Sequence, residues 1–200
     1  MNKDFVFYTD GACSGNPGAG GWAYVELLPC DKGYKTNVVS GSKKETTNNE
    51  MELTAVYMAL VKAFKNKAKQ VTIYCDSAYV VNAITKGWLI NWNNNGWKTV
   101  QDKPVKNKNI WEKMFKLIYE KGLNVTMIKV KGHKGDPLNE LADRSAVEAK
   151  QKVEDWNYVR VRKNNGRNIR RKNDKRCLPK CVQMDKHKYN RKKQFKKHNL

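Results

Sequence analysis

The chain has 200 residues, of which 40 are Lys or Arg and 19 are Asp or Glu, giving a formal net charge of +21. This length fits one domain with an extension or two small domains, and it argues against a collagen, a coiled coil or a multidomain scaffold. The excess of positive charge favours a polyanionic partner, and nucleic acid is the first candidate.

Neither a membrane span nor a secretory signal is expected. The longest apolar run, residues 55–61, ends at Lys62 and is far shorter than the roughly 18 residues that cross a bilayer. The N-terminus carries Asp4 and lacks the apolar stretch of a signal peptide. The five cysteines are an odd number and are scattered, so we expect a cytoplasmic protein without a disulfide framework.

Positive charge is concentrated at the C-terminal end of the chain. Residues 1–150 carry a net charge of +7, whereas residues 151–200 hold 18 basic and 4 acidic side chains, net +14. From about Val153 the sequence shows no sustained apolar period, so it cannot bury enough surface to offset its ordering entropy. We therefore expect a folded domain over residues 1–152 and a basic, disordered extension over residues 153–200.

The extension also contains cysteines and histidines that could be read as a zinc site: Cys177, Cys181, His187 and His198. Their C-x3-C spacing and scattered histidines match common zinc fingers poorly, because those fingers set their ligands in tighter pairs. Incidental placement is the favoured interpretation, and zinc binding is the alternative.

The first part of the folded domain is expected to be a strand meander followed by a helix. Strand-forming runs over residues 4–10, 24–28 and 34–40 are separated by turns that contain Gly. The sequence Thr47-Asn48-Asn49-Glu50 is a capping box, and apolar residues behind it recur at helical spacing. This pattern predicts a helix over residues 48–64.

The second part is expected to alternate strands and helices. The elements are a strand over 71–75, a helix over 78–85, a polar Trp-rich loop over 88–109, a helix over 110–120, a strand over 125–131 and a helix that begins at Asp136-Pro137. This order predicts an α/β fold with a mixed sheet flanked by helices.

Four acids stand at the ends or edges of these elements: Asp10, Glu52, Asp76 and Asp143. Taken singly, such acids are more often turn residues, helix-dipole partners or N-caps. Because strand ends of an α/β sheet converge on one crevice, four acids gathered there would repel one another unless cations held them. Ligands that are all oxygen select Mg²⁺ or Mn²⁺, and two such ions promote displacement at phosphorus. The grouping therefore predicts metal-assisted phosphate chemistry.

The motifs around these acids resemble the type 1 ribonuclease H family over about residues 3–150. The matching stretches are Tyr8–Gly18, Thr47–Leu53, Cys75–Ser77, Val130–His133, and Asn139 and Glu140 with Asp143. The resemblance implies a ribonuclease H-like fold, a five-stranded mixed sheet with helices on both faces. It also implies an endonuclease that hydrolyses the RNA strand of RNA/DNA hybrids and leaves 5′-phosphate and 3′-hydroxyl ends.

The resemblance also implies a role for each acid. Asp10 would bridge two Mg²⁺ ions, with Mn²⁺ as a possible substitute. Glu52 and Asp76 would hold one of these ions, and Asp143 would hold the other, next to the nucleophilic water. His133, in the loop between the last strand and the last helix, would assist proton transfer or product release.

Hybrid recognition is implied at two further places. The groups that would line the minor groove of the hybrid are Gly11, Cys13, Gly15, Asn16, Asn48 and Asn49. Thr47 would bind a phosphate of the DNA strand. The structural alternative is that Asn16 belongs to a turn and Thr47 to a helix cap, and both descriptions can hold together.

A Trp- and Lys-rich segment resembles the basic protrusion of the family, which packs on the DNA strand. Its residues are Trp88, Trp92, Trp97, Trp111, Lys98, Lys103, Lys106 and Lys108. We expect Trp88 to contact a sugar and the other three tryptophans mainly to support the protrusion. Two departures, Asn93-Asn94-Asn95 and Ala78, weaken the expected contacts, and nonspecific binding by the basic extension would restore affinity through counterion release.

Other classes remain as alternatives. A noncatalytic hybrid-binding module with the same fold would have little reason to keep four acids in a basic chain. A transposase or integrase would need a DNA-end recognition domain, a proofreading exonuclease would need a second acid at Ala12, and a reverse-transcriptase fragment would need an upstream polymerase. The glycines near residues 15–21 lead into a strand, so a dinucleotide-binding loop is not favoured. We expect a monomer that binds an RNA/DNA hybrid.

Overall fold

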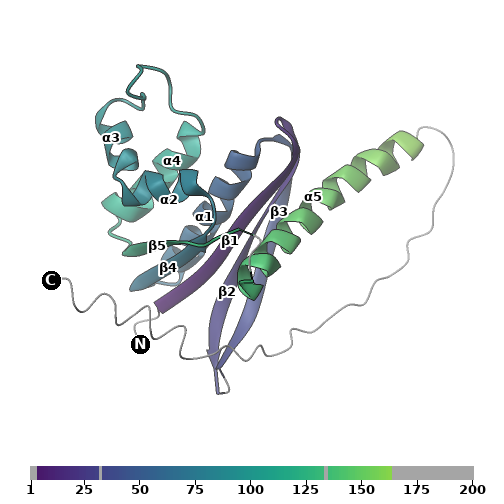
Figure 1. The fold of residues 1–200 in the computed structure, drawn as a ribbon, viewed down its shortest axis with the longest axis horizontal. Helices are drawn as coiled ribbons and strands as arrows, with labels where there is room; N and C mark the ends of the chain where they lie inside the picture. Colours follow the sequence, from purple (N-terminus) through teal and green to yellow (C-terminus); the bar gives the residue numbers. More distant parts are fainter. Residues whose placement is uncertain (1–3, 32, 133–134, 164–200) are drawn as a thin grey trace.

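The computed structural model describes residues 4–31, 33–132 and 135–163, with side chains as far as Val153. Within these residues, five strands form one sheet in the order β3-β2-β1-β4-β5 (Figure 1). The strands are β1 (Asp4–Gly15), β2 (Gly18–Cys30), β3 (Gly33–Thr46), β4 (Gln70–Cys75) and β5 (Val125–Lys129). The β1–β2 and β2–β3 pairs are antiparallel and the β1–β4 and β4–β5 pairs are parallel, which confirms the expected mixed sheet.

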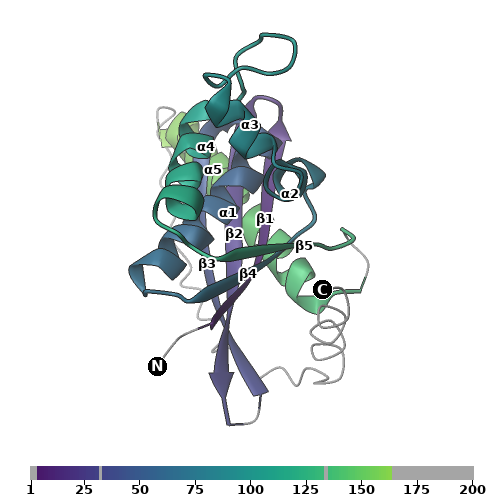
Figure 2. The same ribbon diagram turned by 90° about the vertical axis from the view of Figure 1, so that its left-hand side faces the viewer.

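Helices cover both faces of the sheet, as expected. They are α1 (Asn48–Lys65), α2 (Ala78–Thr85), α3 (Trp88–Asn94), α4 (Lys108–Phe115), the π-helical turn η1 (Lys116–Glu120) and α5 (Pro137–Lys163). Figures 1 and 2 show α5 lying across one face of the sheet and α1, with α4 beside it, on the other.

The central strand β1 supplies side chains to two apolar cores, because successive residues of a strand point to opposite faces. Phe5 and Phe7 are buried in the core beneath α1 and α4, which also contains the fully buried Trp111. Val6 and Tyr8 are buried in the smaller core beneath α5. This alternation fixes which helix each later residue of β1 faces.

Residues 88–109 were expected to be a loop, and that expectation is wrong for the first seven of them and for the last two, which begin α4. Trp88–Asn94 forms α3, which begins after Gly87 in a left-handed conformation with φ of 72°. Leu89 is fully buried and Trp88 and Trp92 pack against the same core, so apolar residues hold this short Asn-containing helix, whose seven residues are too few to show a helical period in the sequence. α3 and the loop behind it stand away from the sheet (Figure 1).

Several boundaries also differ from expectation. β1, β2 and β3 are longer than predicted because backbone pairing continues past the point where apolar alternation ends, as far as the pair Gly15–Gly18. The helix expected over 110–120 divides into α4 and η1, and β5 ends at Lys129.

The last helix extends past the residue at which the basic extension is expected to begin. α5 continues to Lys163 and so includes the first eleven residues of the segment 153–200. Residues 164–200, with the candidate zinc ligands, lie outside the described residues. No helix within the described range is long and apolar enough to span a membrane.

Candidate active site

Asp10 and Asp76 lie side by side at the point where the parallel pairing of β1 and β4 ends, although β1 itself continues to Gly15. The β1–β4 register ends with the pair Thr9–Cys75, and the two aspartates follow directly. Two residues earlier, Tyr8 and Tyr74 stack with ring centroids 4.5 Å apart in the core beneath α5. Side chains two residues apart share a face of the sheet, so β1 directs Asp10 toward α5.

Asp143 reaches this edge because α5 packs tightly against β2. A Cβ atom at Gly21 would lie 2.2 Å from the carbonyl oxygen of Ala146, so glycine is needed for this approach. Ala142, the neighbour of Asp143, is fully buried in the core that contains Tyr8. The helix therefore places Asp143 near Asp10, where the charges of the two side chains interact.

Glu52 comes from the other side of the sheet, through an equally close contact. A Cβ atom at Gly11 would lie 2.2 Å from the backbone nitrogen of Glu52, so the first turn of α1 rests directly on β1. The Glu52 carboxylate accepts hydrogen bonds from Ser77 Oγ and from Asn48 Nδ2, the latter at 3.0 Å. Gly11, the residue after Asp10, thus allows α1 to bring Glu52 close to Asp10.

Electrostatics show that the four acids act on one another. Asp10 is 7% exposed, and burial raises its pKa to about 8, with further contributions from Asp76, Asp143 and Glu52. A hydrogen bond of 2.7 Å from the Gly11 backbone N–H to Asp10 Oδ1 opposes this rise. Burial also raises the pKa of Glu52, and the charge of Asp76 adds to that rise. The arrangement is unfavourable for carboxylates alone and favourable for a cation.

The four acids offer only carboxylate oxygens to the expected divalent ions. Among the residues that the structure describes, no three His, Cys, Asp or Glu side chains form a group that could by itself hold a metal ion. Mg²⁺ is nevertheless bound through one or two carboxylates, with water and substrate phosphate completing its shell. Asp10 and the three carboxylates that interact with it fit that pattern of ligation.

His133, the remaining predicted catalytic residue, lies outside the described residues. Gly132, the residue before His133, is described and lies close to Asp76. A Cβ atom at Gly132 would lie 2.9 Å from Asp76 Oδ2, so this loop approaches one of the four carboxylates closely.

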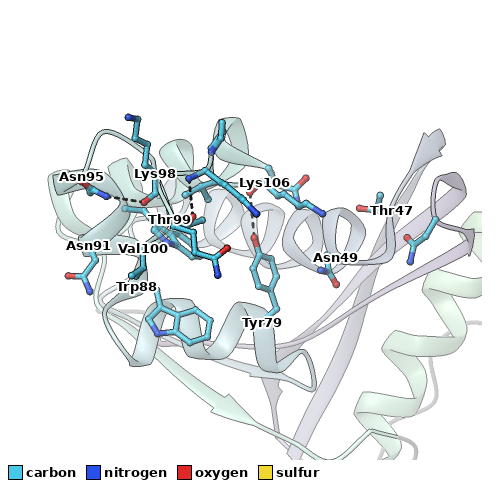
Figure 3. Close-up of a pocket in the computed structure, with 17 residues that line it drawn as sticks. Thr47, Asn49, Tyr79, Trp88, Asn91, Asn95, Lys98, Thr99, Val100 and Lys106 are labelled. Atoms are coloured by element: carbon cyan, nitrogen blue, oxygen red, sulfur yellow. Dashed lines mark hydrogen bonds between the residues drawn. The ribbon is translucent and has the colours of Figure 1, made fainter.

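A cavity of about 1100 Å³ adjoins the site between the first turn of α1, α3 and the loop that follows α3 (Figure 3). Seven predicted substrate-binding residues line it: Asn16, Thr47, Asn49, Trp88, Lys98, Lys103 and Lys106. In Figure 3, Thr47 and Asn49 stand at the α1 end of the cavity, away from Trp88. The structure thus brings together residues that are up to 90 positions apart.

The cavity also has polar lining residues that sequence reasoning missed: Tyr79, Asn91, Asn95, Thr99, Gln101 and Asn107. The Asn-rich sequence of α3 was the available signal, but the sequence-based expectation for Asn93-Asn94-Asn95 is weaker contact with phosphate or groove. Lys108, expected in the protrusion, does not line the cavity and instead pairs with Glu112 at 3.7 Å.

Four predicted groove residues do not line the cavity and have structural contacts instead. Gly11 admits α1, and Gly15 turns the β1–β2 hairpin with φ of 88°. Cys13 Sγ donates to the carbonyl oxygen of Thr46 at 3.3 Å. Asn48 donates from its side chain to Glu52 and from its backbone to Asn16 Oδ1 at 2.9 Å.

The tryptophans divide largely as expected. Trp111 is fully buried and donates to Tyr79 Oη at 2.9 Å, and Trp97 is also buried. Trp88 lines the cavity with part of its surface exposed. Trp92 does both: it packs edge-on to Trp111, with ring centroids 5.4 Å apart, and it also lines the cavity.

None of the four acids lines the cavity. The link between them is the first turn of α1, which carries Thr47 and Asn49 at the cavity and Glu52 at the acids. A polyanion lying in the cavity and crossing this turn would meet the acids next.

Comparisons with solved structures agree with this geometry. The chain is similar to LC9-RNase H1, described as a type 1 RNase H with the type 2 active-site motif, with a TM-score of 0.66 and 27% identity, covering 78% of this chain and 81% of that one. It is also similar to the RNase H domain of PFV, with a TM-score of 0.63 and 27% identity, covering 76% and 96%.

Sequence comparisons point the same way. The "Ribonuclease H" of Syntrophomonas wolfei is 45% identical over 147 residues, which cover 74% of this chain and 96% of that protein. The "Ribonuclease H" of Thermoanaerobacter sp. is 48% identical over 148 residues, covering 74% and 90%. The family model for RNase H matches residues 2–151. The chain belongs to the ribonuclease H family.

Proposed function

We propose that this ribonuclease H hydrolyses the RNA strand of RNA/DNA hybrids with two divalent ions, Mg²⁺ or Mn²⁺, and leaves 5′-phosphate and 3′-hydroxyl ends. The observation that carries the proposal is the buried Asp10, whose pKa of about 8 reflects burial and the charges of three further acids. Such a group is stabilised by cations, and cations are what hydrolysis at phosphorus requires.

The acids have separate tasks in this proposal. Asp10, central and most buried, contacts both ions, while Glu52 and Asp76 hold one ion and Asp143 holds the other. When bound, the ions would lower the pKa of the attacking water and neutralise negative charge at the phosphate. His133 assists proton transfer or product release.

The cavity holds the hybrid next to these acids. Trp88 contacts a sugar of the DNA strand, Thr47 binds one of its phosphates, and the lysines neutralise others. Asn16, Asn48 and Asn49 read the minor groove, where 2′-hydroxyls distinguish the RNA strand. A structural neighbour, the foamy viral protease-reverse transcriptase, is described in complex with an RNA/DNA hybrid.

The rest of the proposal concerns the molecule in the cell. The basic residues beyond α5 bind nucleic acid nonspecifically, the enzyme acts as a monomer, and its location is the cytoplasm. The net charge of +14 over residues 151–200 supports the first of these statements.

The test uses one end-labelled RNA strand, presented alone, paired with RNA and paired with DNA, with and without Mg²⁺. Cleavage of the RNA/DNA hybrid, dependent on Mg²⁺ and absent from Asp10→Asn protein, is expected. Tight binding of the hybrid without any cleavage would contradict the proposal, as would cleavage that persists in the variant.

A further inference from the structure

Both oxygens of the Glu52 carboxylate are held by neighbouring side chains. Asn48, one turn earlier in α1, donates from Nδ2 to Oε1 at 3.0 Å. Ser77, at the junction of β4 and α2, donates from Oγ to Oε2. A glutamate side chain loses considerable rotamer freedom when it is fixed, so two donors from two elements define the direction of this carboxylate.

The Ser77 contact stands out because this residue occupies a helix N-cap without capping it. Its backbone is extended, with φ of −68° and ψ of 107°, and its carbonyl accepts the first bond of α2 from Val81 N. A serine at this position normally accepts from an N–H of the first helical turn. Ser77 makes no such side-chain bond, and its hydroxyl is directed to Glu52 instead.

Thr47 shows the contrast within the same chain. It is the N-cap of α1, and its Oγ1 accepts from the backbone N–H of Glu50 at 3.3 Å. The two helices beside the acids therefore begin differently. At the start of α1 the Thr47 hydroxyl caps the helix, whereas at the start of α2 the Ser77 hydroxyl donates to the Glu52 carboxylate. The residue type at Ser77 is thus explained by Glu52 and not by helix α2.

The location of Ser77 ties Glu52 to the other acids. Ser77 is 6% exposed and directly follows Asp76, so its hydroxyl is shielded from water and fixed relative to that carboxylate. Glu52 belongs to α1, whereas Asp76 follows β4. The Ser77–Glu52 hydrogen bond therefore connects Glu52 to the residue next to Asp76. Losing this bond would leave Glu52 held at one oxygen only.

We propose that Ser77 is a positioning residue, whose hydroxyl fixes the Glu52 carboxylate beside Asp76 in the direction needed to hold a divalent ion. The inference rests on the proposed function, since it assumes that Glu52 and Asp76 share an ion. Groups that orient metal ligands typically change metal affinity by about 10–100-fold when they are removed.

The experiment compares full-length Ser77→Ala with the wild type and with Ser77→Thr, which retains the hydroxyl. The matched control is Thr85→Ala on the same helix, because Thr85 Oγ1 donates to the carbonyl oxygen of Val81 at 2.8 Å and has no part in the site. Two quantities are measured: the Mg²⁺ concentration that gives half-maximal hybrid cleavage, and the Mg²⁺ dissociation constant from calorimetry on the protein alone. Thermal unfolding in EDTA monitors the fold of each variant.

For Ser77→Ala, both Mg²⁺ values should rise by about tenfold, while its unfolding temperature shifts no more than that of Thr85→Ala. Ser77→Thr should return the Mg²⁺ values to within about threefold of the wild type. An unchanged half-maximal Mg²⁺ concentration in Ser77→Ala, or the same rise in Thr85→Ala, would overturn the inference. Failure of the proposed function is seen separately, as a wild-type protein that does not cut the hybrid at any Mg²⁺ concentration.

Discussion

Asp10 has an environment that suits a neutral carboxyl group or a carboxylate bound to a cation. Burial is the main cause of its raised pKa, and the charges of Asp76, Asp143 and Glu52 add to it. The one favourable contact from Gly11 does not offset these effects. Without a cation, ionised Asp10 therefore destabilises the fold that holds it.

The first prediction is that Asp10→Asn stabilises the cation-free protein at neutral pH while abolishing cleavage. The pKa of Asp10 is about 8 in the folded chain against an ordinary value of 3.8, so between these values the folded state binds the proton more tightly. The contribution of Asp10 to stability is thus complete below about pH 4 and is lost as the pH rises toward 8. Asn does not ionise, so the gain at pH 8 should be on the order of 1–3 kcal/mol after relaxation around the charge.

Urea unfolding in EDTA at pH 4 and pH 8 measures this difference. The advantage of Asp10→Asn should vanish at pH 4 and should shrink at pH 8 when Mg²⁺ is added, since only the wild type gains from the cation. A variant that is equally stable or less stable than the wild type at pH 8 would show that Asp10 is not strained by its neighbours.

At the residue scale, the sequence identified the acids but not everything around them. Asp10 and Asp76 were visible because each directly follows a strand-forming run, and parallel strands place such ends together. The diversion of the Ser77 hydroxyl to Glu52 was not visible, because Ser77 carries an ordinary N-cap signal. Which of two possible acceptors or donors a hydroxyl meets depends on tertiary packing.

At the element scale, two glycines set the distances between the sheet and its helices. Gly11 faces α1 and Gly21 faces α5, and any side chain at either position would collide with helix backbone. Ala12 and Gly21 are partners in the β1–β2 register, so these contacts lie close together on opposite faces. The helices that carry Glu52 and Asp143 therefore pack closely on the sheet near Asp10.

The second prediction follows from this packing. Gly11→Ala should destabilise the protein by about 2 kcal/mol or more, because the new methyl group overlaps the backbone of Glu52 and α1 must move. Cleavage should fall more than tenfold at a temperature where the variant remains folded, since an ångström of misplacement costs that much.

Gly33→Ala is the control for Gly11→Ala. Its position has φ of 130° and nothing within 4 Å of the added methyl group, so it carries backbone strain without a collision and is remote from the acids. It should lose stability with near-normal cleavage. Equal loss of cleavage in both variants would argue against a specific role for the Gly11–α1 contact.

A third prediction concerns the loop after α3. Lys98 and Lys108 are half-exposed lysines, and each pairs with an acid four residues later, but only Lys98 lines the cavity. If Lys98 contacts a phosphate, Lys98→Ala should weaken hybrid binding and reduce the slope of log affinity against log salt by about one. Lys108→Ala should leave this slope unchanged, and equivalent behaviour of the two variants in a fluorescence titration would contradict the assignment.

The elements themselves could be predicted where apolar periodicity is strong, as in α1, α2 and the start of α5. The helix α3 could not, because its seven residues, with Leu89 fully buried and three Asn among them, are too few to show an apolar period. The ends of β2 and β3 at their shared hairpin, Pro29, Cys30 and Gly33, were missed because pairing between the two strands, rather than burial, holds them in register. Backbone pairing leaves little trace in side-chain pattern.

At the scale of the whole molecule, the acids and the positive charge are separated along the chain. The family match ends at residue 151, α5 continues to Lys163, and residues 164–200 still hold 14 basic and 2 acidic side chains. More than half of the formal net charge thus lies beyond the part of the chain that carries the acids. A folded domain could be predicted from composition, but the end of α5 could not, because the helix continues where the apolar stripe has ended.

The last prediction is that truncation after Lys163 weakens hybrid binding without impairing the cut itself. The segment removed carries a net charge of +12, and each phosphate that it neutralises releases counterions. The truncated protein should therefore bind less tightly at low salt and show a flatter dependence of log affinity on log salt. The cleavage rate at saturating hybrid should stay within about twofold, since all four acids and the cavity residues remain. A second truncation, after Val153, also removes residues 154–163, which are the last ten residues of α5. Comparing the two truncated proteins distinguishes the contribution of these helical residues from that of residues 164–200. An unchanged salt slope after removal of residues 164–200 would show that these residues do not contact nucleic acid.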